Sequence, residues 1–230
     1  MTYPTTIRVI DTETTGFLPD ASMVEIAWTD LLVGDDGFAE IGETISHLLK
    51  PKHPIGLEAM AVHHITEAMV ADAPMLGQLD PQPSIGSDYL AAHNADFDKG
   101  FYPVDREWIC TLKCSRRLWE DAPSHKNGVL RYWLNLDADM DYDRTLPAHR
   151  AGPDSYVTAY LLERMLREVS LEQLVQWSRE PSMLPRVNFG KHRGMKFADV
   201  PSDYLEWLVS DKCSMGADVK ATARFHLGAK

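Results

Sequence analysis

Residues 6–16 read Thr-Ile-Arg-Val-Ile-Asp-Thr-Glu-Thr-Thr-Gly. The apolar half of this stretch predicts a buried strand over residues 6–11, and Thr15-Gly16 predicts the turn that ends it. Asp11 and Glu13 are two positions apart, so their side chains project from the same face of a strand. Two neighbouring carboxylates repel each other, and a divalent cation removes that repulsion. The stretch therefore predicts a metal-binding carboxylate pair at the end of a buried strand.

The remaining sequence predicts strands first, and then strands that alternate with helices. Strands are predicted over residues 24–33 and 43–49, and a turn at residues 34–37 joins them into a meander with the first strand. The other predicted elements are a helix over 54–69, a strand over 89–93 leading into a helix that carries Phe97 and Asp98, a strand over 107–111, helices around 115–119 and 128–136, and a helix over 154–169 with Pro153 in its first turn. This order indicates an α/β fold in which helices flank a mixed five-stranded sheet.

The composition changes near residue 180. We predict a domain over residues 1–178, a linker over 179–185 and a small basic region over 186–230. Within the last region, a basic hairpin is expected over 187–197 and a short helix over 204–209. Residues 186–198 contain basic side chains and no acidic one. Three interpretations of this region stay open: a contact with duplex phosphates, a homodimer contact, or a solvated hairpin.

The bulk composition limits the class of protein. A formal net charge of −11 argues against a protein that coats nucleic acid, but it allows an enzyme that holds only a chain end. No signal-peptide pattern and no apolar stretch long enough to span a membrane is present, so we expect a cytoplasmic protein without a membrane partner. The three cysteines are an odd number and are expected to be buried, unpaired thiols.

Two later segments add further candidates to the carboxylate pair. Residues 93–98 read His-Asn-Ala-Asp-Phe-Asp, and residues 149–154 read His-Arg-Ala-Gly-Pro-Asp. Asp98 is predicted near the start of a helix, and Asp154 opens the long helix that follows the His149 loop. Hydrolysis of a phosphodiester needs metal held by carboxylates and a base that takes a proton from water. These segments together offer both.

The three segments, 11–16, 93–98 and 149–154, resemble the sequence motifs of the DEDDh 3′→5′ exonucleases, a branch of the ribonuclease H-like superfamily. The similarity extends through residues 57–66, 107–113 and 189–194, and so covers nearly the whole chain. This resemblance implies a deoxyribonuclease that releases 5′-mononucleotides from DNA 3′ ends, single-stranded or duplex, in DNA repair and recombination.

The resemblance also implies roles for individual residues. Four carboxylates would hold two Mg²⁺ ions, for which Mn²⁺ can substitute, and His149 would deprotonate the attacking water; the four are Asp11, Glu13, Asp98 and Asp154. The expected substrate contacts are Thr12, Thr14, Phe17, Leu18, Glu58, His63, Ile65, Asn94 and Phe97. Phe17 and Leu18 follow the metal-binding turn directly and are predicted to pry apart the last base pair, with ordinary core packing as the alternative.

Other functions compete with this interpretation. The same chemistry serves an exoribonuclease or a polymerase proofreading exonuclease, because the motif residues act on the phosphate and do not read the 2′-hydroxyl. A catalytically idle nucleic-acid-binding module would be expected to have lost a carboxylate, and none is lost. The acidic run over residues 137–143 resembles the start of a calcium loop, but Tyr142 and Ala148 stand where such a loop needs Gly and Glu.

Overall fold

The structure, a computed structural model, describes residues 4–34 and 39–228. The turn predicted at residues 34–37 falls largely on residues outside these ranges. In the part of the chain that is described, no helix combines the length and the apolar character that crossing a membrane requires.

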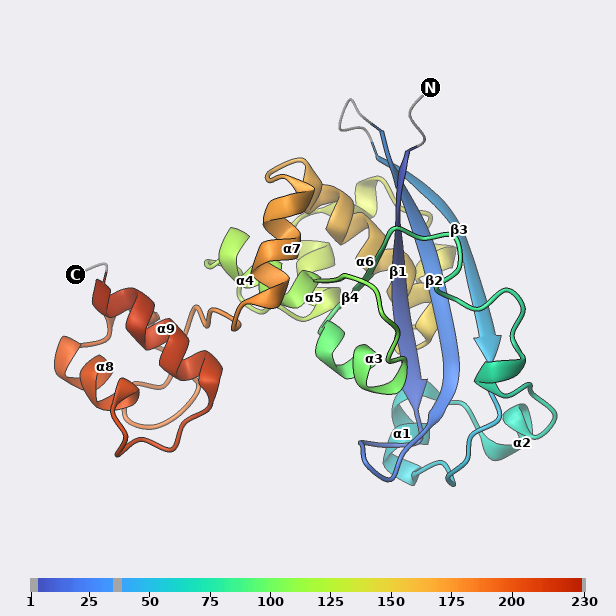
Figure 1. Cartoon of the computed structure of the whole chain (residues 1–230), viewed down its shortest axis with the longest axis horizontal. Coiled ribbons are helices and arrows are strands. Elements are labelled where there is room, and N and C mark those ends of the chain that lie inside the picture. The colour runs from blue at the N-terminus through green and yellow to red at the C-terminus, as the bar shows by residue number, and fades with distance from the viewer. Residues whose placement is uncertain (1–3, 35–38, 229–230) are drawn as a thin grey trace.

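A five-stranded mixed sheet forms the centre of the molecule, as predicted. Its strand order is β3-β2-β1-β4-β5. The first three strands, β1 (Thr5–Thr14), β2 (Met23–Val33) and β3 (Ala39–Leu48), form the antiparallel meander. The short strands β4 (Tyr89–Ala92) and β5 (Trp108–Cys110) are parallel to β1. Strand β1 extends three residues beyond the predicted end at residue 11, so it carries the whole acidic motif (Figure 1).

Helices cover both faces of the sheet and form the C-terminal region. They are α1 (Leu57–His63), α2 (Glu67–Val70), α3 (Ala95–Phe101), α4 (Thr111–Leu118), α5 (Asn127–Trp133), α6 (Ala151–Leu166), α7 (Leu171–Arg179), α8 (Ser202–Val209) and α9 (Ala217–Gly228). The single helix predicted over 54–69 is wrong. His64 has a φ of 59° and divides the segment into α1 and α2, because this left-handed conformation ends a helix.

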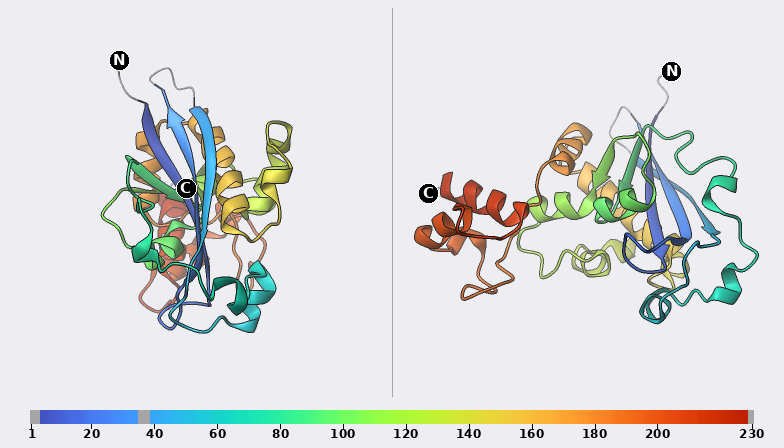
Figure 2. Two further views of the ribbon diagram at one scale, coloured as in Figure 1. Left: turned by 90° about the vertical axis from the view of Figure 1, so that its right-hand side faces the viewer. Right: turned by 60° about the horizontal axis from the view of Figure 1, so that its bottom comes forward.

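The two faces of the sheet have separate cores. Helix α6 lies against β1, β2 and β3, and Ile7 and Val9 of β1 pack on its side with Leu161 (Figures 1 and 2). Ile10 points to the opposite face, where it packs with residues of α3 and the segments around it. The alternation of side chains along β1 therefore assigns Asp11 and Glu13 to the face that carries α6.

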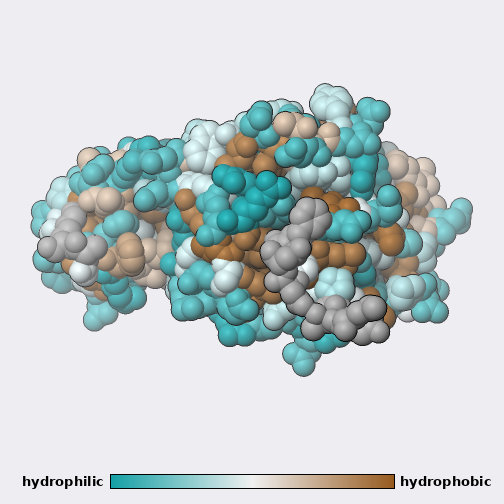
Figure 3. All heavy atoms as spheres, turned by 90° about the horizontal axis from the view of Figure 1, so that it is seen from above, coloured by the Kyte–Doolittle hydropathy of each residue, from teal (hydrophilic) through white to brown (hydrophobic). Residues whose placement is uncertain are grey.

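The C-terminal region has a core of its own. Its buried side chains are Val187, Phe197, Val200, Leu205, Leu208, Cys213, Val219 and Ala223. The region forms the narrower lobe at the left of the space-filling view (Figure 3), and we call residues 186–228 the C-terminal lobe. Its boundary as a domain remains a prediction, because residues before 186 also contact it: the Ser182 amide donates to Asp218.

The hairpin predicted over 187–197 is present as a short antiparallel pairing without extended strands. A bridge joins Arg186 to Lys196, and the Val187 amide donates to the Met195 carbonyl at 2.9 Å. Gly190 and Gly194 have φ values of 58° and 89°, which bend the chain away from an extended path. The basic side chains therefore lie on the short arms and the bent loop of this hairpin.

Candidate active site

Three of the four predicted metal-binding carboxylates lie together. Oxygen atoms of Asp11, Glu13 and Asp154 are all within 4.8 Å of one another. The first two come from the same face of β1, and the third comes from the first turn of α6, which crosses that face. An antiparallel meander and a helix more than a hundred residues later therefore meet at the end of β1.

The fourth carboxylate, Asp98, lies beside this group but deeper in the protein. It belongs to α3 and is 3% exposed. The Thr12 hydroxyl donates to its Oδ1 at 2.8 Å, so a residue of the acidic motif itself fixes the side chain. Asp98 also raises the pKa of Asp11, as expected for two neighbouring carboxylates. The structure thus brings all four predicted acids to one end of the sheet.

Burial and mutual repulsion raise the pKa values of these acids. Burial, followed by repulsion from Asp154, raises the pKa of Glu13 to about 8, and burial raises the pKa of Asp98 to about 7. Burial, followed by repulsion from Asp98, raises the pKa of Asp11 well above its usual value. No basic side chain is ion-paired with any of the four within residues 4–34 and 39–228. Buried carboxylates that lack a basic partner are suited to bind divalent cations, which neutralise their charge.

His149 is exposed on the loop that precedes α6. Its backbone has a φ of 59°, and its amide donates to Asp154 Oδ2 at 3.2 Å. The backbone is therefore tied to a carboxylate of the site, while the imidazole remains exposed to solvent.

A buried ion pair that was not predicted holds this loop in place. Glu25 lies opposite Glu13 in the β1–β2 register and is 2% exposed. Its carboxylate accepts from Nε and Nη2 of Arg150, both at 2.8 Å, and from the Ala151 amide at 3.0 Å. Burial alone would raise the pKa of Glu25, but these hydrogen bonds and one from Ser46 outweigh burial and lower it. A charged residue within the apolar run Met23–Trp28 was the available signal, since such a residue needs a partner when buried.

Apolar side chains project from the loop after β1. Phe17 is 83% exposed and Leu18 is 49% exposed, so core packing, the alternative for this pair, does not describe them. The Phe17 ring meets Phe97 edge-on, with centroids 6.2 Å apart, beside Asp98. Asn94 and Glu58 are exposed at the same end of the molecule, at the start of α3 and in α1.

Four of the expected substrate contacts lie in the interior. His63 is 1% exposed; its Nε2 lies 3.2 Å from the Thr14 carbonyl, and its Nδ1 accepts from the Ile65 amide at 3.0 Å. Both ring nitrogens are therefore engaged in holding the turn after β1. Ile65 is fully buried and Thr12 bonds Asp98, while the Thr14 hydroxyl donates to the Gly16 carbonyl. In this conformation these four side chains support the site, and direct substrate contact by His63 and Ile65 does not fit their positions.

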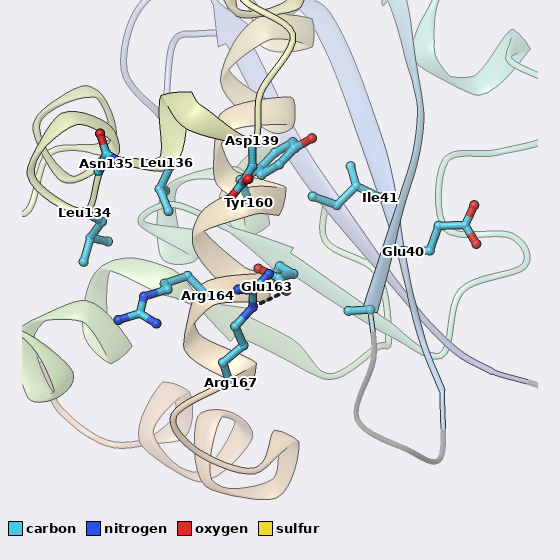
Figure 4. A pocket seen from close by; sticks show the side chains of 11 residues that line it. Glu40, Ile41, Leu134, Asn135, Leu136, Asp139, Tyr160, Glu163, Arg164 and Arg167 are labelled. Atoms are coloured by element: carbon cyan, nitrogen blue, oxygen red, sulfur yellow. Dashed lines mark hydrogen bonds and ion pairs between the residues drawn. The ribbon is translucent and has the colours of Figure 1, made fainter.

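A second hollow, at the far end of α6, does not compete as an active site. It has a volume of about 470 Å³ and lies between β3, the segment around residue 136 and α6 (Figure 4). Its basic side chains are already paired, because Arg167 bonds Glu163 and Arg164 bonds Glu168. The acidic run over 137–143 is also not gathered into a metal-binding group among the described residues, and Asp137 bonds Arg131.

Residues 9–162 match the sequence model of a family described as Exonuclease, RNase_T. The chain belongs to this exonuclease family. It is 37% identical over 227 residues to exodeoxyribonuclease 10 of Escherichia coli K12, covering 96% of this chain and 98% of that protein. It is also 29% identical over 189 residues to the PolC-type DNA polymerase III of Bacillus subtilis, of which only 12% is covered.

A solved structure gives the same assignment. Exonuclease X in complex with 5′ overhanging duplex DNA is similar with a TM-score of 0.64 and 39% identity, over 75% of this chain and 99% of that one. The nuclease domain of 3′hExo, a DEDDh family member bound to rAMP, matches with a TM-score of 0.56 at 19% identity and supports the fold alone. The predictions of an exonuclease and of a ribonuclease H-like sheet are therefore confirmed.

Proposed function

We propose that this protein is a metal-dependent 3′→5′ exodeoxyribonuclease that hydrolyses phosphodiester bonds at DNA 3′ ends and releases 5′-mononucleotides. The observation that carries the proposal is the meeting of Asp11, Glu13 and Asp154 within 4.8 Å. Support for DNA as the substrate comes from exodeoxyribonuclease 10, which this chain matches over nearly its full length. A role in DNA repair follows from the same similarity.

The carboxylates are the metal ligands of this proposal. Asp11, Glu13, Asp98 and Asp154 would hold two Mg²⁺ ions, and Mn²⁺ would substitute. When bound, two such ions neutralise charge on the attacking and leaving oxygens of a phosphodiester. The protein contributes by burying the ligands and by fixing them to different elements. The Thr12 hydroxyl orients Asp98, and the His149 amide orients Asp154.

His149 is the proposed general base. Its exposed imidazole can accept a proton from the attacking water at a ring nitrogen and release it to solvent. A positioned base adds roughly 10²–10⁴-fold to a rate. The ion pair between Glu25 and Arg150 keeps the base near the carboxylates, because Arg150 is its immediate neighbour in the chain.

Phe17 and Leu18 are the proposed wedge. Both are exposed at the tip of the loop that follows the carboxylate strand, where an apolar pair can replace the stacking of a terminal base pair. Changing both to Ala should slow digestion of blunt duplex more than digestion of single strands. Equal slowing on the two substrates contradicts a wedge.

The deciding experiment is a nuclease assay with 3′-labelled and 5′-labelled single-stranded DNA, with and without Mg²⁺. The wild type should release the 3′ label first and only with metal, and His149→Ala should be slower by about 10²–10⁴-fold. Release of the 5′ label first, or full activity in a chelator, would overturn the proposal. A matched RNA oligonucleotide distinguishes it from an exoribonuclease, which would digest RNA at least as fast.

A further inference from the structure

A hollow that takes no part in the proposed chemistry adjoins the wedge. It has a volume of about 650 Å³, and Leu18 forms part of its wall. None of the four metal-binding carboxylates lines it, and neither does His149. Its apolar lining comes mainly from Met23, Leu49, Leu76 and Phe101. Leu18 packs closely on α3: a Cβ added at Gly100 would lie 3.0 Å from Leu18 Cδ1. We call this cavity the Phe101 hollow.

A row of aromatic rings leads from the wedge to the Phe101 hollow. The Phe17 and Phe97 centroids are 6.2 Å apart, and the Phe97 and Phe101 centroids are 5.1 Å apart. Phe97 and Phe101 are four residues apart in α3 and so share one face of the helix. Aromatic side chains are stacking platforms for unpaired bases. The row therefore offers a path for unpaired nucleotides from the loop tip into the cavity.

Cationic and polar groups complete the lining. Lys50 and Lys52 line the hollow and are exposed, and neither ammonium group has an ion pair or hydrogen bond with any described residue. The Nδ1 atom of His53, also in the lining, is buried without a hydrogen-bond partner in the described part of the chain. An apolar floor, two free cations and one unpaired ring nitrogen together match a nucleotide, which presents a base, a phosphate and polar edge groups.

The position of the hollow indicates which strand it receives. Asp11 and Glu13 project from the face of β1 that carries α6. Met23, Leu49, Leu76 and Phe101 belong to the core of the opposite face. The strand that is cut must bring its 3′ end to the carboxylates, and none of the four, including Asp98 of α3, lines the hollow. A nucleotide that enters the hollow therefore belongs to the complementary strand.

We propose that the Phe101 hollow binds the nucleotide of the complementary strand that becomes unpaired once a duplex end has been opened; at a blunt end this is the 5′-terminal nucleotide. This inference rests on the proposed function and extends it to the strand that is not cut. By holding that nucleotide, the hollow opposes re-annealing of the terminal base pair, and the effect exists only on duplex substrates.

The first test compares substrates in a single variant. In Lys50→Ala/Lys52→Ala, loss of two phosphate contacts should slow digestion of a blunt duplex and of a duplex with a 5′ overhang by about tenfold. Digestion of single-stranded DNA should stay within about twofold of the wild type, because only the complementary strand uses the hollow. Arg106→Ala/Lys212→Ala removes the same charge at exposed positions away from the hollow and should leave all three rates unchanged. Equal slowing on duplex and single strand, or no slowing on duplex, overturns the inference.

The second test does not require hydrolysis. All three native cysteines are buried, so an exposed cysteine can be modified selectively. A Cβ at Gly77, in the hollow's lining, would meet no atom within 4 Å, which makes Gly77→Cys a suitable probe. A thiol-reactive group on the 5′ end of the complementary strand should crosslink to this variant, while the same group on the opposing 3′ end should not; Glu206→Cys in α8 is the control.

These two tests separate the inference from the proposed function. Normal digestion without a crosslink to the complementary strand would remove the hollow's role and leave the nuclease. A crosslink in a protein that digests no 3′ end would instead remove the proposed nuclease and keep the nucleotide site.

Discussion

At the scale of single residues, the acidic side chains of the site share protons or metal ions as their counterions, so their protonation and metal binding are expected to be coupled. The pKa of Glu13 is about 8 in the folded protein, against an ordinary value of 4.5, because the side chain is buried and lies close to Asp154. Between about pH 4.5 and about pH 8 the folded state therefore binds more protons than the unfolded state does. Stability from this group is fully present below pH 4.5 and is lost as the pH rises through 8.

We therefore expect the metal-free protein to lose thermal stability as the pH rises through this window. Mg²⁺ should raise the melting temperature more at about pH 8 than at about pH 5, because at the higher pH the cation replaces protons that the site no longer holds. Thermal unfolding in Mg²⁺ and in chelator, measured at both pH values, tests this. Glu13→Gln is the control and should reduce the pH dependence of the metal-free protein, while the raised pKa values of Asp11 and Asp98 maintain the rest of it. A metal-induced shift of equal size at both pH values contradicts the expectation.

Loss of one metal-binding carboxylate should separate activity from stability. Asp154→Asn removes a ligand, and metal ions contribute several kcal/mol to phosphodiester hydrolysis, so the rate should fall by at least about 100-fold. The same change removes repulsion from Asp11 and Glu13, so the metal-free protein should melt at a higher temperature than the wild type. Activity on labelled single strands and calorimetry in chelator measure the two effects. A variant that is inactive but less stable without metal would indicate a misfolded site.

At the scale of elements, residues from β1, β2, α3 and α6 together form the site. The ion pair between Glu25 and Arg150 fixes the start of α6, and the Glu25 carboxylate also accepts from the first amide of that helix. We therefore expect Glu25 to be a positioning residue, which holds the loop of His149 and the start of α6 in place.

Glu25→Gln should lower kcat by about tenfold or more and leave KM for single-stranded DNA nearly unchanged, because His149, the proposed base, and Asp154, a proposed metal ligand, lose their fixed position. The partly buried Arg150 would also lose its charged partner, which should cost about 2–3 kcal/mol of stability. Asp30→Asn is the matched control. It breaks another bidentate ion pair of β2, between Asp30 and Arg8 of β1, and should lower stability without lowering kcat. An equal loss of kcat in both variants would assign a merely structural role to Glu25.

The sequence predicts much of this arrangement, and the exceptions have physical reasons. Strand alternation predicts that Asp11 and Glu13 share a face, and in the structure their carboxylate oxygens lie within 4.8 Å of each other and of Asp154. The break at His64 could not be predicted, because it depends on the tertiary contact of His63 with the Thr14 carbonyl. Burial of a histidine that looks like a surface contact is likewise a property of packing and not of local pattern.

At the scale of the whole molecule, a loop of the nuclease domain contacts both the C-terminal lobe and the active site. Lys196 of the lobe bonds Asp121, and the same loop continues to Asn127, whose side chain donates to the Asp154 carbonyl at 3.3 Å. The sequence predicts a basic appendage, but it does not predict the appendage's own core or helix α9. That core packs residues as far apart as Val187 and Ala223, and contacts between residues so far apart in the chain leave no short periodic pattern in the sequence.

The basic loop of the lobe should hold the phosphates of a duplex whose end lies in the active site. Lys196 is paired with Asp121 and Arg186 donates to the Gly194 carbonyl, which leaves Lys191 and Arg193 as the exposed cations of this loop. If each contacts one phosphate, Lys191→Ala/Arg193→Ala should reduce the slope of log K against log salt by roughly 2 for duplex DNA, because each contact releases about 0.9 counterion.

Binding of a blunt duplex to the inactive Asp154→Asn protein, measured by fluorescence anisotropy over a range of salt concentrations, gives this slope directly. Arg106→Ala/Lys212→Ala again removes the same charge and should leave the slope unchanged, which excludes a general effect of net charge. An unchanged slope would favour one of the other two interpretations of the loop, a solvated hairpin or a contact between two copies of the chain. Only the contact between two copies predicts a change of mass. In that case the Lys191 and Arg193 changes would alter the molecular mass in solution and leave the salt slope as it is in the parent protein. A duplex contact requires the opposite result, because counterion release depends on phosphates and not on self-association.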